Sequence, residues 1–363
     1  MTSARHRIAL AEPDLGEQEL DAVRQVFASG TLTDGPWTET FEQAFAARHG
    51  TEHAVAFSSG TAALTAMHLT LHLGPDDEIV VPSMTFISTA TSVLHAGARP
   101  VFADIRPDTF TLDVDDVARR LTPRTRAIVA VHYGGQAADL AELRALADDA
   151  GIVLLEDAAE AHGATYRGTP VGGAGTMAMF SFTPTKNITT GEGGMVTTHD
   201  GDHARQLRLL RNHGQTAVDR HEVLGFNWRL SEMQAAIGTV QLAKLDDVLA
   251  RKRQQAARLT ESLAASPLIT TPHVADDRDH VFMLYTLLVE GARDVVAAGL
   301  AEAGIESRTY FPPAHRQPVF PDQAVELPVT DWAHERMLSV PAHPSLSEAD
   351  LDEVAKRVTD LAG

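Results

Sequence analysis

The sequence predicts an α/β protein with a large, mostly parallel sheet and a smaller α+β unit near the C-terminal end. Short apolar or β-branched runs alternate with helical patterns between residues 52 and 198, as in sheets whose parallel strands are joined by helical crossovers. One long helical pattern follows over residues 231–264. Strand and helix patterns then continue to the last helix, which indicates a second, smaller unit.

The expected strands of the large sheet are short and rich in apolar residues, as buried strands are. They span His53–Phe57, Glu78–Val81, Pro100–Asp104, Ala127–Val131, Ile152–Glu156, Met177–Phe182 and Met195–Thr198. The helical patterns between them include Thr61–Leu73, Thr85–Ala96 and Asp139–Ala150.

The smaller unit is expected to contain a strand at Phe282–Val289, a helix at Arg293–Ala303, a strand at Glu306–Phe311 and a closing helix at Ser347–Leu361. We place the domain boundary within the long helix, near residue 245. Residues 1–245 would then form a large domain with an N-terminal arm, and residues 246–363 a small domain. A chain of 363 residues is long enough for two such units.

Composition and charge exclude several classes of partner and site. The formal charge of −19 repels nucleic acid and anionic membranes, so neither is expected to bind. No segment has the roughly 18 apolar residues of a membrane span, and the N-terminal residues lack the apolar core of a signal peptide. Cysteine is absent, which excludes disulfides and thiolate metal ligands and fits a reducing compartment. We therefore expect a cytoplasmic protein without a metal site.

Ligands of doubly wound sheets gather at the carboxyl ends of the strands, and three strand ends here carry polar residues. The first strand is followed by Ser58, Ser59, Gly60 and Thr61 at the start of a helical pattern. The amides of a helix N-terminus bind phosphate well. An ordinary capped helix explains the same residues, so this turn alone leaves both interpretations open.

The second strand end carries Asp157, with Glu160 and His162 close behind. A carboxylate in this place can bind a metal, orient a base or pair with a ring nitrogen. It can equally cap a helix. The metal interpretation has little support, because no paired ligand spacing accompanies the aspartate.

The third strand end precedes Lys186, which follows the apolar run that ends near Ser181 and comes just before the glycine-rich turn Gly191–Gly194. An exposed loop lysine is the commonest alternative. A lysine beside an apolar pocket can instead become a nucleophilic amine that forms Schiff bases.

One cofactor uses all three features. Pyridoxal 5′-phosphate (PLP) requires donors for its phosphate, a carboxylate for its pyridine nitrogen and a lysine for its aldehyde. The order of phosphate turn, aspartate and lysine over successive strands is typical of the type I aminotransferase fold. The sequence therefore predicts PLP as the cofactor, with Lys186 and Asp157 as the catalytic residues.

Seven ordered segments make the chain resemble the DegT/DnrJ/StrS-type sugar aminotransferases, from about Leu10 to the final helix. These segments are SSGTAAL, DEIVVPSMTFISTATSVLHAGARPVFADI, EDAAEAHGATYRG, SFTPTKNITTGEGGMV, LRNHGQ, LGFNWRLSEMQAAIG and YFPPAHRQPVF. The combination of EDAAEA with ITTGEGGMV is most similar to the perosamine-synthase-like sugar 4-aminotransferases of this family.

The resemblance implies a role for each matching residue of the cofactor site. Lys186 would carry PLP as an internal aldimine and then move the proton between cofactor and substrate. Asp157 would keep the pyridine nitrogen protonated. Phe86 would stack on one ring face, with core packing as its alternative, and Glu160 stands where many relatives place Gln or His against the ring. The phosphate would be held by Ser59, Gly60, Thr61 and Ser181.

The resemblance also implies a homodimer with shared active sites, because Asn227 would reach the phosphate of a neighbouring subunit's cofactor. Tyr310 and His315 would close over the sugar from the small domain. Arg229 or Arg308 would meet the phosphates of the substrate, although arginines are ordinary surface residues as well.

The implied reaction is a ping-pong transamination of a nucleotide-linked 4-keto-6-deoxy sugar to the 4-amino sugar, with glutamate as the amino donor. The presence of Lys186 argues against the branch of the family that has histidine there and performs 3-dehydration. A 3-keto sugar nucleotide or a cyclitol ketone remains an alternative substrate. An aminobenzoate-type synthase that removes water, and a non-catalytic regulator on the same fold, are further alternatives.

Overall fold

Seven short strands form the central sheet. In the computed structural model, which describes residues 7–321 and 325–363, these strands are β1 (His53–Phe57), β2 (Glu78–Pro82), β3 (Arg99–Ala103), β4 (Thr125–Val131), β5 (Val153–Asp157), β8 (Met177–Ser181) and β9 (Gly194–Thr198). Their spatial order is β1-β9-β8-β5-β4-β2-β3. Neighbouring strands from β8 to β3 are parallel, while β9 is antiparallel to both β8 and β1. The prediction of a large, mostly parallel sheet is confirmed.

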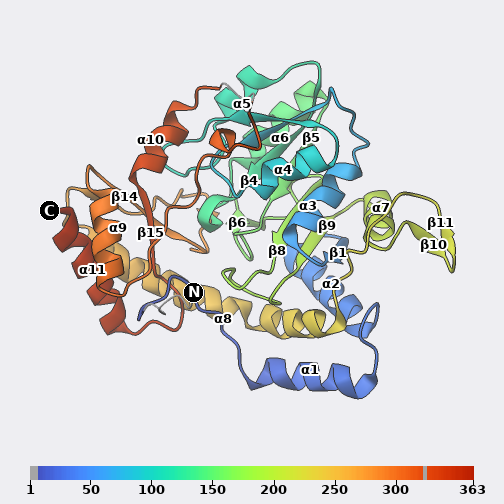
Figure 1. Ribbon diagram of the computed structural model, residues 1–363, viewed down its shortest axis with the longest axis horizontal. Coiled ribbons are helices and arrows are strands. Elements are labelled where there is room, and N and C mark those ends of the chain that lie inside the picture. The colour runs from blue at the N-terminus through green and yellow to red at the C-terminus, as the bar shows by residue number, and fades with distance from the viewer. Residues whose placement is uncertain (1–6, 322–324) are drawn as a thin grey trace.

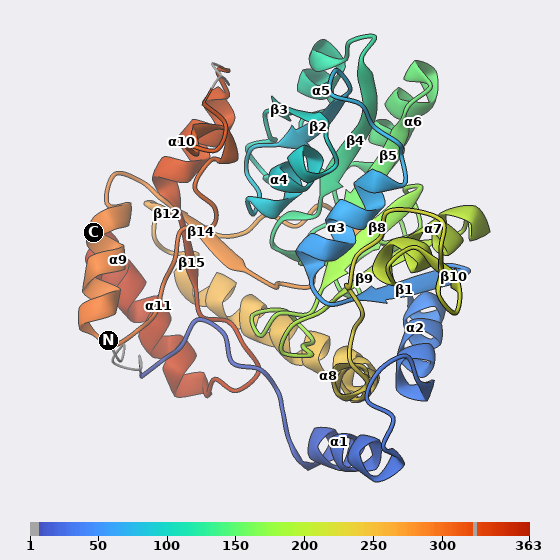
Figure 2. The same cartoon turned by 45° about the vertical axis from the view of Figure 1, so that its right-hand side comes forward.

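Helices cover both faces of this sheet (Figures 1 and 2). The helices of the described residues, including those of the smaller unit, are α1 (Glu17–Ser29), α2 (Pro36–His49), α3 (Gly60–Leu69), α4 (Ser88–His95), α5 (Val114–Arg120), α6 (Leu140–Ala150), α7 (Gly201–Arg211), α8 (Glu232–Leu263), α9 (Arg293–Glu302), α10 (Pro328–Arg336) and α11 (Glu348–Ala362). Along β4, Ile128 and Ala130 belong to the core cluster that contains α2 and α6, whereas Ala127 and Val129 belong to the cluster that contains α3, α4 and α7. This alternation is the period of two expected for a strand buried on both faces.

The smaller unit is built on a three-stranded antiparallel sheet beside α9 and α11. Its strands are β12 (Ile269–Thr270), β14 (Tyr285–Val289) and β15 (Met337–Val340). The long helix α8 joins the two units, because Leu245 and Leu249 pack in the core of the large sheet and Ala256 and Leu259 pack in the core of the smaller one. The boundary near residue 245 stays a prediction.

Two small sheets lie outside these cores. One contains β6 (Thr165–Tyr166), β7 (Thr169–Pro170) and β13 (Arg278–Asp279). The other is a hairpin of β10 (Gln215–Ala217) and β11 (Arg220–His221), which projects from the body of the molecule at the right of Figure 1. Two short 3-10 turns, η1 (Tyr133–Gly135) and η2 (Ala314–Arg316), complete the described elements.

The predicted strand Glu306–Phe311 is wrong. Arg308 forms only an isolated bridge, in which its backbone exchanges hydrogen bonds with that of Ser339 at 3.1 and 2.8 Å. A longer ladder cannot form toward the end of this segment, because Pro312 and Pro313 have no amide hydrogen. The partner of β14 is instead β15, and helices α1, α2 and α10 are also additions to the predicted elements.

Within the described ranges, no helix is both long and apolar enough to cross a membrane. The cytoplasmic location stays a prediction.

A buried polar cluster fixes the end of β5. Glu156 is fully buried; its Oε2 lies 3.0 Å from Nε2 of His132, and its carboxylate accepts hydrogen bonds from the amides of Gly172 and Gly175 at 2.9 and 2.6 Å. Burial by itself would raise the pKa of this carboxyl, but the hydrogen bonds outweigh that effect and hold the pKa below its ordinary 4.5. The cluster therefore fixes the chain directly before Asp157.

We expect His132→Ala to lower the free energy of unfolding by about 3 kcal/mol, because removing one partner of a buried pair leaves the other uncompensated. The folded-state pKa of Glu156 lies below 4.5, so this stabilisation is present above that pH and is lost as the pH falls through the folded-state pKa. Urea unfolding at several pH values measures the difference. His95→Ala, at an exposed position in α4, is the control and should change stability by less than about 0.5 kcal/mol. Equal losses in the two variants would contradict the role of His132.

Candidate active site

A cavity of about 420 Å³ lies at the carboxyl ends of β1, β5 and β8, where the three predicted strand ends meet. Residues from the loop around position 310 form its outer wall. The predicted site residues that line the cavity are Ser59, Gly60, Thr61, Phe86, Asp157, Glu160, Ser181, Lys186, Arg308 and Tyr310. Most of the predicted site is therefore brought together by the fold.

The turn after β1 presents the amino end of α3 to the cavity. Ser59 caps this helix, since its Oγ accepts a hydrogen bond from the amide of Ala62 at 3.1 Å. Gly60 and Thr61 line the cavity, and amides in the first turn of a helix have no partner within the helix. Gly60 lies so close to β8 that an added Cβ would be 3.0 Å from the Cβ of Ser181. A helix end with free amides, pressed against a strand end, fits a phosphate group.

Asp157 is the last residue of β5, and only 5% of it is exposed. Its Oδ2 accepts a hydrogen bond from the hydroxyl of Thr89 at 2.7 Å, and its Oδ1 accepts one from the amide of Ala159 at 3.2 Å. Burial nevertheless raises the pKa of this carboxyl above its ordinary 3.8. A buried carboxylate held in this way at the wall of a cavity favours a cationic partner, such as a protonated ring nitrogen.

Lys186 lies in the loop between β8 and β9, with 12% of its side chain exposed. Its Nζ is 3.3 Å from Oε1 of Glu160, and the other oxygen of that carboxylate accepts a hydrogen bond from the amide of Gly134 at 2.8 Å. The resemblance to the family implies a position for Glu160 against a cofactor ring. In the structure, Glu160 lines the same cavity and is the ion-pair partner of the lysine.

Aromatic and cationic side chains form the outer wall. Phe86 is 56% exposed, and its ring centroid lies 6.0 Å from that of Phe311, so packing in the core does not explain its position. The guanidinium of Arg308 lies 5.0 Å from the centre of the Tyr310 ring. Burial raises the pKa of the Tyr310 hydroxyl, which therefore stays neutral at pH 7. These groups suit a polar ligand that carries negative charge.

Asn227 and Arg229 do not belong to the cavity lining within the described part of the chain. Asn227 is exposed, and its backbone bridges that of Asn212. Arg229 donates to the side chain of Asn212 and lies 3.6 Å from Asp34. The structure does not bring these two residues to the cavity, and their roles stay predictions.

The position of His315 corrects its predicted role. The residue is 7% exposed, and its Nδ1 lies 2.7 Å from the hydroxyl of Ser83 in a core that also contains Phe102. The Nδ1 atom of His315 therefore has its hydrogen-bond partner in the core, next to the end of β2. Gln317, two residues further along the chain, lines the cavity instead.

The site also contains residues that are not among the predicted ones. Thr89 orients Asp157, and its spacing from Phe86 in the run FISTA puts both near the start of α4, which is a usable local signal. Met283 and Gln317 reach the cavity from the C-terminal part of the chain. No local pattern marks these two, because only tertiary packing brings them to the site.

Comparison with known proteins identifies the family. Residues 13–359 match the DegT/DnrJ/EryC1/StrS aminotransferase family. The chain belongs to this family of aminotransferases. It is 41% identical over 357 residues to GDP-perosamine synthase of Caulobacter vibrioides, and the match covers 96% of each protein.

Solved structures agree with the fold. DesV of S. venezuelae, in complex with a ketimine intermediate, has a TM-score of 0.92 and 40% identity over 95% of this chain and 94% of its own. The PLP form of Spr1654 from Streptococcus pneumoniae has a TM-score of 0.92 and 28% identity over 97% of this chain and 98% of its own. The predicted family and the predicted type I aminotransferase fold are confirmed.

We expect Asp157→Asn to raise the unfolding temperature of the cofactor-free protein at pH 7 and to abolish amino transfer. The folded-state pKa lies above 3.8, so the stabilising contribution of Asp157 is present below that pH and is lost as the pH rises through the folded-state pKa. A neutral amide avoids the cost of burying the charge. The hydroxyls of Thr85 and Thr89, 2.7 Å apart, can exchange donor and acceptor roles to accommodate it.

Thermal unfolding without cofactor measures the change in stability. Asp149→Asn, at an exposed position in α6, is the control and should leave the unfolding temperature and the activity unchanged. A lower unfolding temperature for Asp157→Asn at pH 7 would contradict the cost assigned to the buried carboxylate.

Proposed function

We propose that this aminotransferase uses PLP to transfer an amino group from glutamate to a nucleotide-linked 4-keto-6-deoxy sugar, giving the 4-amino sugar. One observation supports the proposal most directly: the carboxylate of Asp157, the amine of Lys186 and the amino end of α3 line a single cavity. The 41% identity to GDP-perosamine synthase supports the choice of sugar.

The residues at the amino end of α3 fit the phosphate of PLP. The amides of Gly60 and Thr61 and the hydroxyls of Ser59 and Ser181 would hold it. A phosphate in this position would also gain from the positive end of the helix dipole, which offsets the negative charge of the whole chain locally.

Three other residues fit the ring and the aldehyde. Asp157 would pair with the pyridine nitrogen, Phe86 would cover a face of the ring, and the amine of Lys186 would bind the aldehyde covalently. When bound, the cofactor supplies an electron sink for the charge that develops as a proton leaves the neighbouring carbon.

The residues of the chain would control protons and orientation around that carbon. Lys186 would remove and return the proton through its Nζ, a contribution of about 10² to 10⁴ in rate for a positioned general acid and base. Glu160, 3.3 Å away, would hold this amine in the cavity between steps. Asp157 would keep a proton on the ring nitrogen, because a buried carboxylate is stabilised by an adjacent cation.

Arg308 and Tyr310 would recognise the substrate. The lining of the cavity, over the described residues, contains two cations, Lys186 and Arg308. With Lys186 engaged at the reacting carbon, Arg308 would meet the phosphates of the nucleotide, and Tyr310 beside it would contact the sugar. A guanidinium suits this role, since it can bind phosphate oxygens through two parallel hydrogen bonds.

The proposal is tested by incubating the purified protein with glutamate and a panel of 4-keto sugar nucleotides, 3-keto sugar nucleotides and cyclitol ketones. Mass spectrometry identifies the products. We expect amino transfer to a 4-keto sugar nucleotide. Transfer only to a 3-keto sugar or a cyclitol would replace the proposed substrate, and loss of water without amino transfer would replace the proposed reaction.

We expect Lys186→Ala to fold but to lose both the covalent attachment of PLP and all detectable amino transfer. Circular dichroism and thermal unfolding test the fold, and mass spectrometry after borohydride reduction tests the attachment. Lys356→Ala, at an exposed position in α11, is the matched control and should behave like the wild type. Turnover by Lys186→Ala would contradict its catalytic role.

We also propose that the chain acts as a homodimer with shared active sites, in which Asn227 reaches the cofactor phosphate of the neighbouring subunit. Asn227 is exposed, and it follows the projecting β10–β11 hairpin. In and directly after this hairpin, Val218 and Leu224 are each 87% exposed. Large apolar side chains on a projecting segment fit a contact with a second copy of the chain.

We expect mixed dimers of Lys186→Ala and Asn227→Ala to be more active than either variant alone. In each mixed dimer, one site would receive Lys186 and Asn227 from different subunits and would be intact. If the two variants associate at random, about half of the dimers are mixed, and each mixed dimer has one intact site. At most about a quarter of all active sites would then be intact. Light scattering first establishes the dimer, and activity is then measured after co-expression. A mixture no more active than its components would contradict the shared site.

A further inference from the structure

Lys252 is a buried lysine near the cavity, and the proposed mechanism gives it no role. It lies in α8 and is 6% exposed. Its Nζ donates hydrogen bonds to Oδ1 of Asn187 at 2.8 Å and to the carbonyl oxygen of Phe282 at 3.3 Å. Among the residues that the structure describes, no carboxylate forms an ion pair with it. The ammonium is therefore held by uncharged acceptors.

An ammonium in this environment costs folding free energy. Burial lowers the pKa of Lys252 to about 8, and the neighbouring charge of Lys186 acts in the same direction, against the opposite effect of Glu160. An apolar side chain of similar length would avoid this cost. The placement therefore points to a role in the site rather than in the stability of the core.

The contact with Asn187 places Lys252 next to the reactive amine. Asn187 directly follows Lys186, is 6% exposed, and donates from its Nδ2 to the carbonyl oxygen of Val281 at 3.4 Å. Lys186, Asn187 and Lys252 also line one small cavity of about 20 Å³. Lys252 thus ties the loop that carries Lys186 to α8 and to the segment Val281–Phe282.

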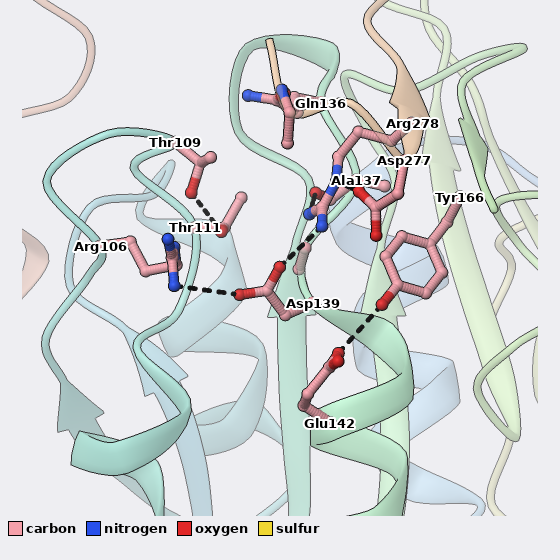
Figure 3. A network of polar contacts seen from close by, with 12 residues as sticks. Arg106, Thr109, Thr111, Gln136, Ala137, Asp139, Glu142, Tyr166, Asp277 and Arg278 are labelled. Atoms are coloured by element: carbon pink, nitrogen blue, oxygen red, sulfur yellow. Dashed lines mark hydrogen bonds and ion pairs between the residues drawn. The ribbon is translucent and has the colours of Figure 1, made fainter. Parts of the chain in front are cut away.

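This segment is itself fixed to the large domain. Arg278, with 5% of its side chain exposed, forms an ion pair with Asp139 at 2.8 Å and donates to the carbonyl oxygen of Ala137 at 2.7 Å (Figure 3). A few residues further on, the amide of Val281 donates to the carbonyl oxygen of Gly135 at 3.0 Å. The acceptors that hold Lys252 therefore have fixed positions.

We propose that Lys252 is a positioning residue which, through Asn187, fixes the backbone of Lys186 so that its amine meets an aldehyde in the cavity. The inference rests on the proposed use of PLP. Condensation of the amine with the aldehyde forms a C=N bond and releases water, and its equilibrium depends on how well the amine is oriented beforehand. Glu160 holds the end of the lysine side chain, while Asn187 and Lys252 hold its backbone.

A comparison of two ligands separates this role from a general structural one. PLP can form the bond to Lys186. Pyridoxamine 5′-phosphate has an amine in place of the aldehyde, so it fits the same site without forming that bond. A residue that positions Lys186 affects the binding of PLP alone, whereas a residue that shapes the pocket affects both ligands.

The experiment measures the Kd of each ligand for the cofactor-free protein by titration calorimetry. For Lys252→Met, we expect the Kd of PLP to rise roughly tenfold, which is the effect of losing one hydrogen bond from a charged group. The Kd of pyridoxamine 5′-phosphate should stay within about twofold of the wild-type value. Lys252→Arg, which keeps the donors, should restore part of the PLP affinity. Asn187→Leu should raise the Kd of PLP as much as Lys252→Met does. The double variant should bind PLP no more weakly than either single variant, because both substitutions remove the same contact.

Lys244→Met is the matched control. Lys244 lies in the same helix, and its Nζ pairs with Glu19 at 2.7 Å. Its loss should leave the ratio of the two Kd values unchanged. Thermal unfolding confirms that each variant is folded, and Asn187→Leu tests the same contact if Lys252→Met does not fold.

Two failures can be told apart. Equal changes in the Kd of both ligands, or no change in their ratio, would overturn the role of Lys252 while leaving the proposed function intact. If borohydride reduction of the wild-type protein with PLP leaves no adduct on Lys186, the proposed function fails, and the role of Lys252 fails with it.

Discussion

The parallel pairing of β5 and β8 is the constraint on which the active site depends. Because the two strands run in the same direction, Asp157 at the end of one and Ser181 at the end of the other reach the same edge of the sheet. The chain after Ser181 then turns back, so that Lys186 meets Glu160 from the loop after β5. If these strands were antiparallel, the carboxylate and the amine would stand at opposite edges.

The site and the residues behind it include groups whose burial is unfavourable by itself. The carboxylate of Asp157 has a raised pKa and the ammonium of Lys252 a lowered one, and burial is the first cause of both shifts. Such groups are expected where a site is organised for a charged ligand and not for stability alone. The buried cluster around Glu156 has a different character, because its hydrogen bonds outweigh the effect of burial. It holds the strand from which Asp157 emerges.

The balance of charge supports the same interpretation. The chain has a formal charge of −19, and the carboxylates of Asp157, Glu160 and Glu192 line the cavity. The amine of Lys186, the guanidinium of Arg308 and the amino end of α3 line it as well. A negatively charged protein can bind an anionic ligand only where local donors overcome its overall field. The cavity provides these donors at two places, one beside Lys186 and one at the outer wall.

Local patterns in the sequence predicted the part of the site that lies at strand ends. Asp157, Lys186 and the turn at Gly60 each follow an apolar run, and such a run marks a buried strand whose carboxyl end lies at the ligand-binding edge of a parallel sheet. The interpretation of residues 306–311 as a strand was wrong, because strand-like alternation alone does not supply a pairing partner. The predicted role of His315 failed for a related reason: a histidine near a predicted site can satisfy its ring nitrogen in the core, as it does with Ser83.

The sequence by itself determined the fold class and the order of phosphate turn, carboxylate and lysine, because these depend on short-range periodicity and on residues at the ends of strands. The resemblance of seven ordered segments indicated the family. Only the tertiary structure decided which distant groups act on them. Thr89 orients Asp157, Glu160 holds the amine of Lys186, and Lys252 holds the residue that follows it. A hydrogen bond between side chains on different elements depends on how helices and strands pack, and residue spacing along one chain does not contain that information.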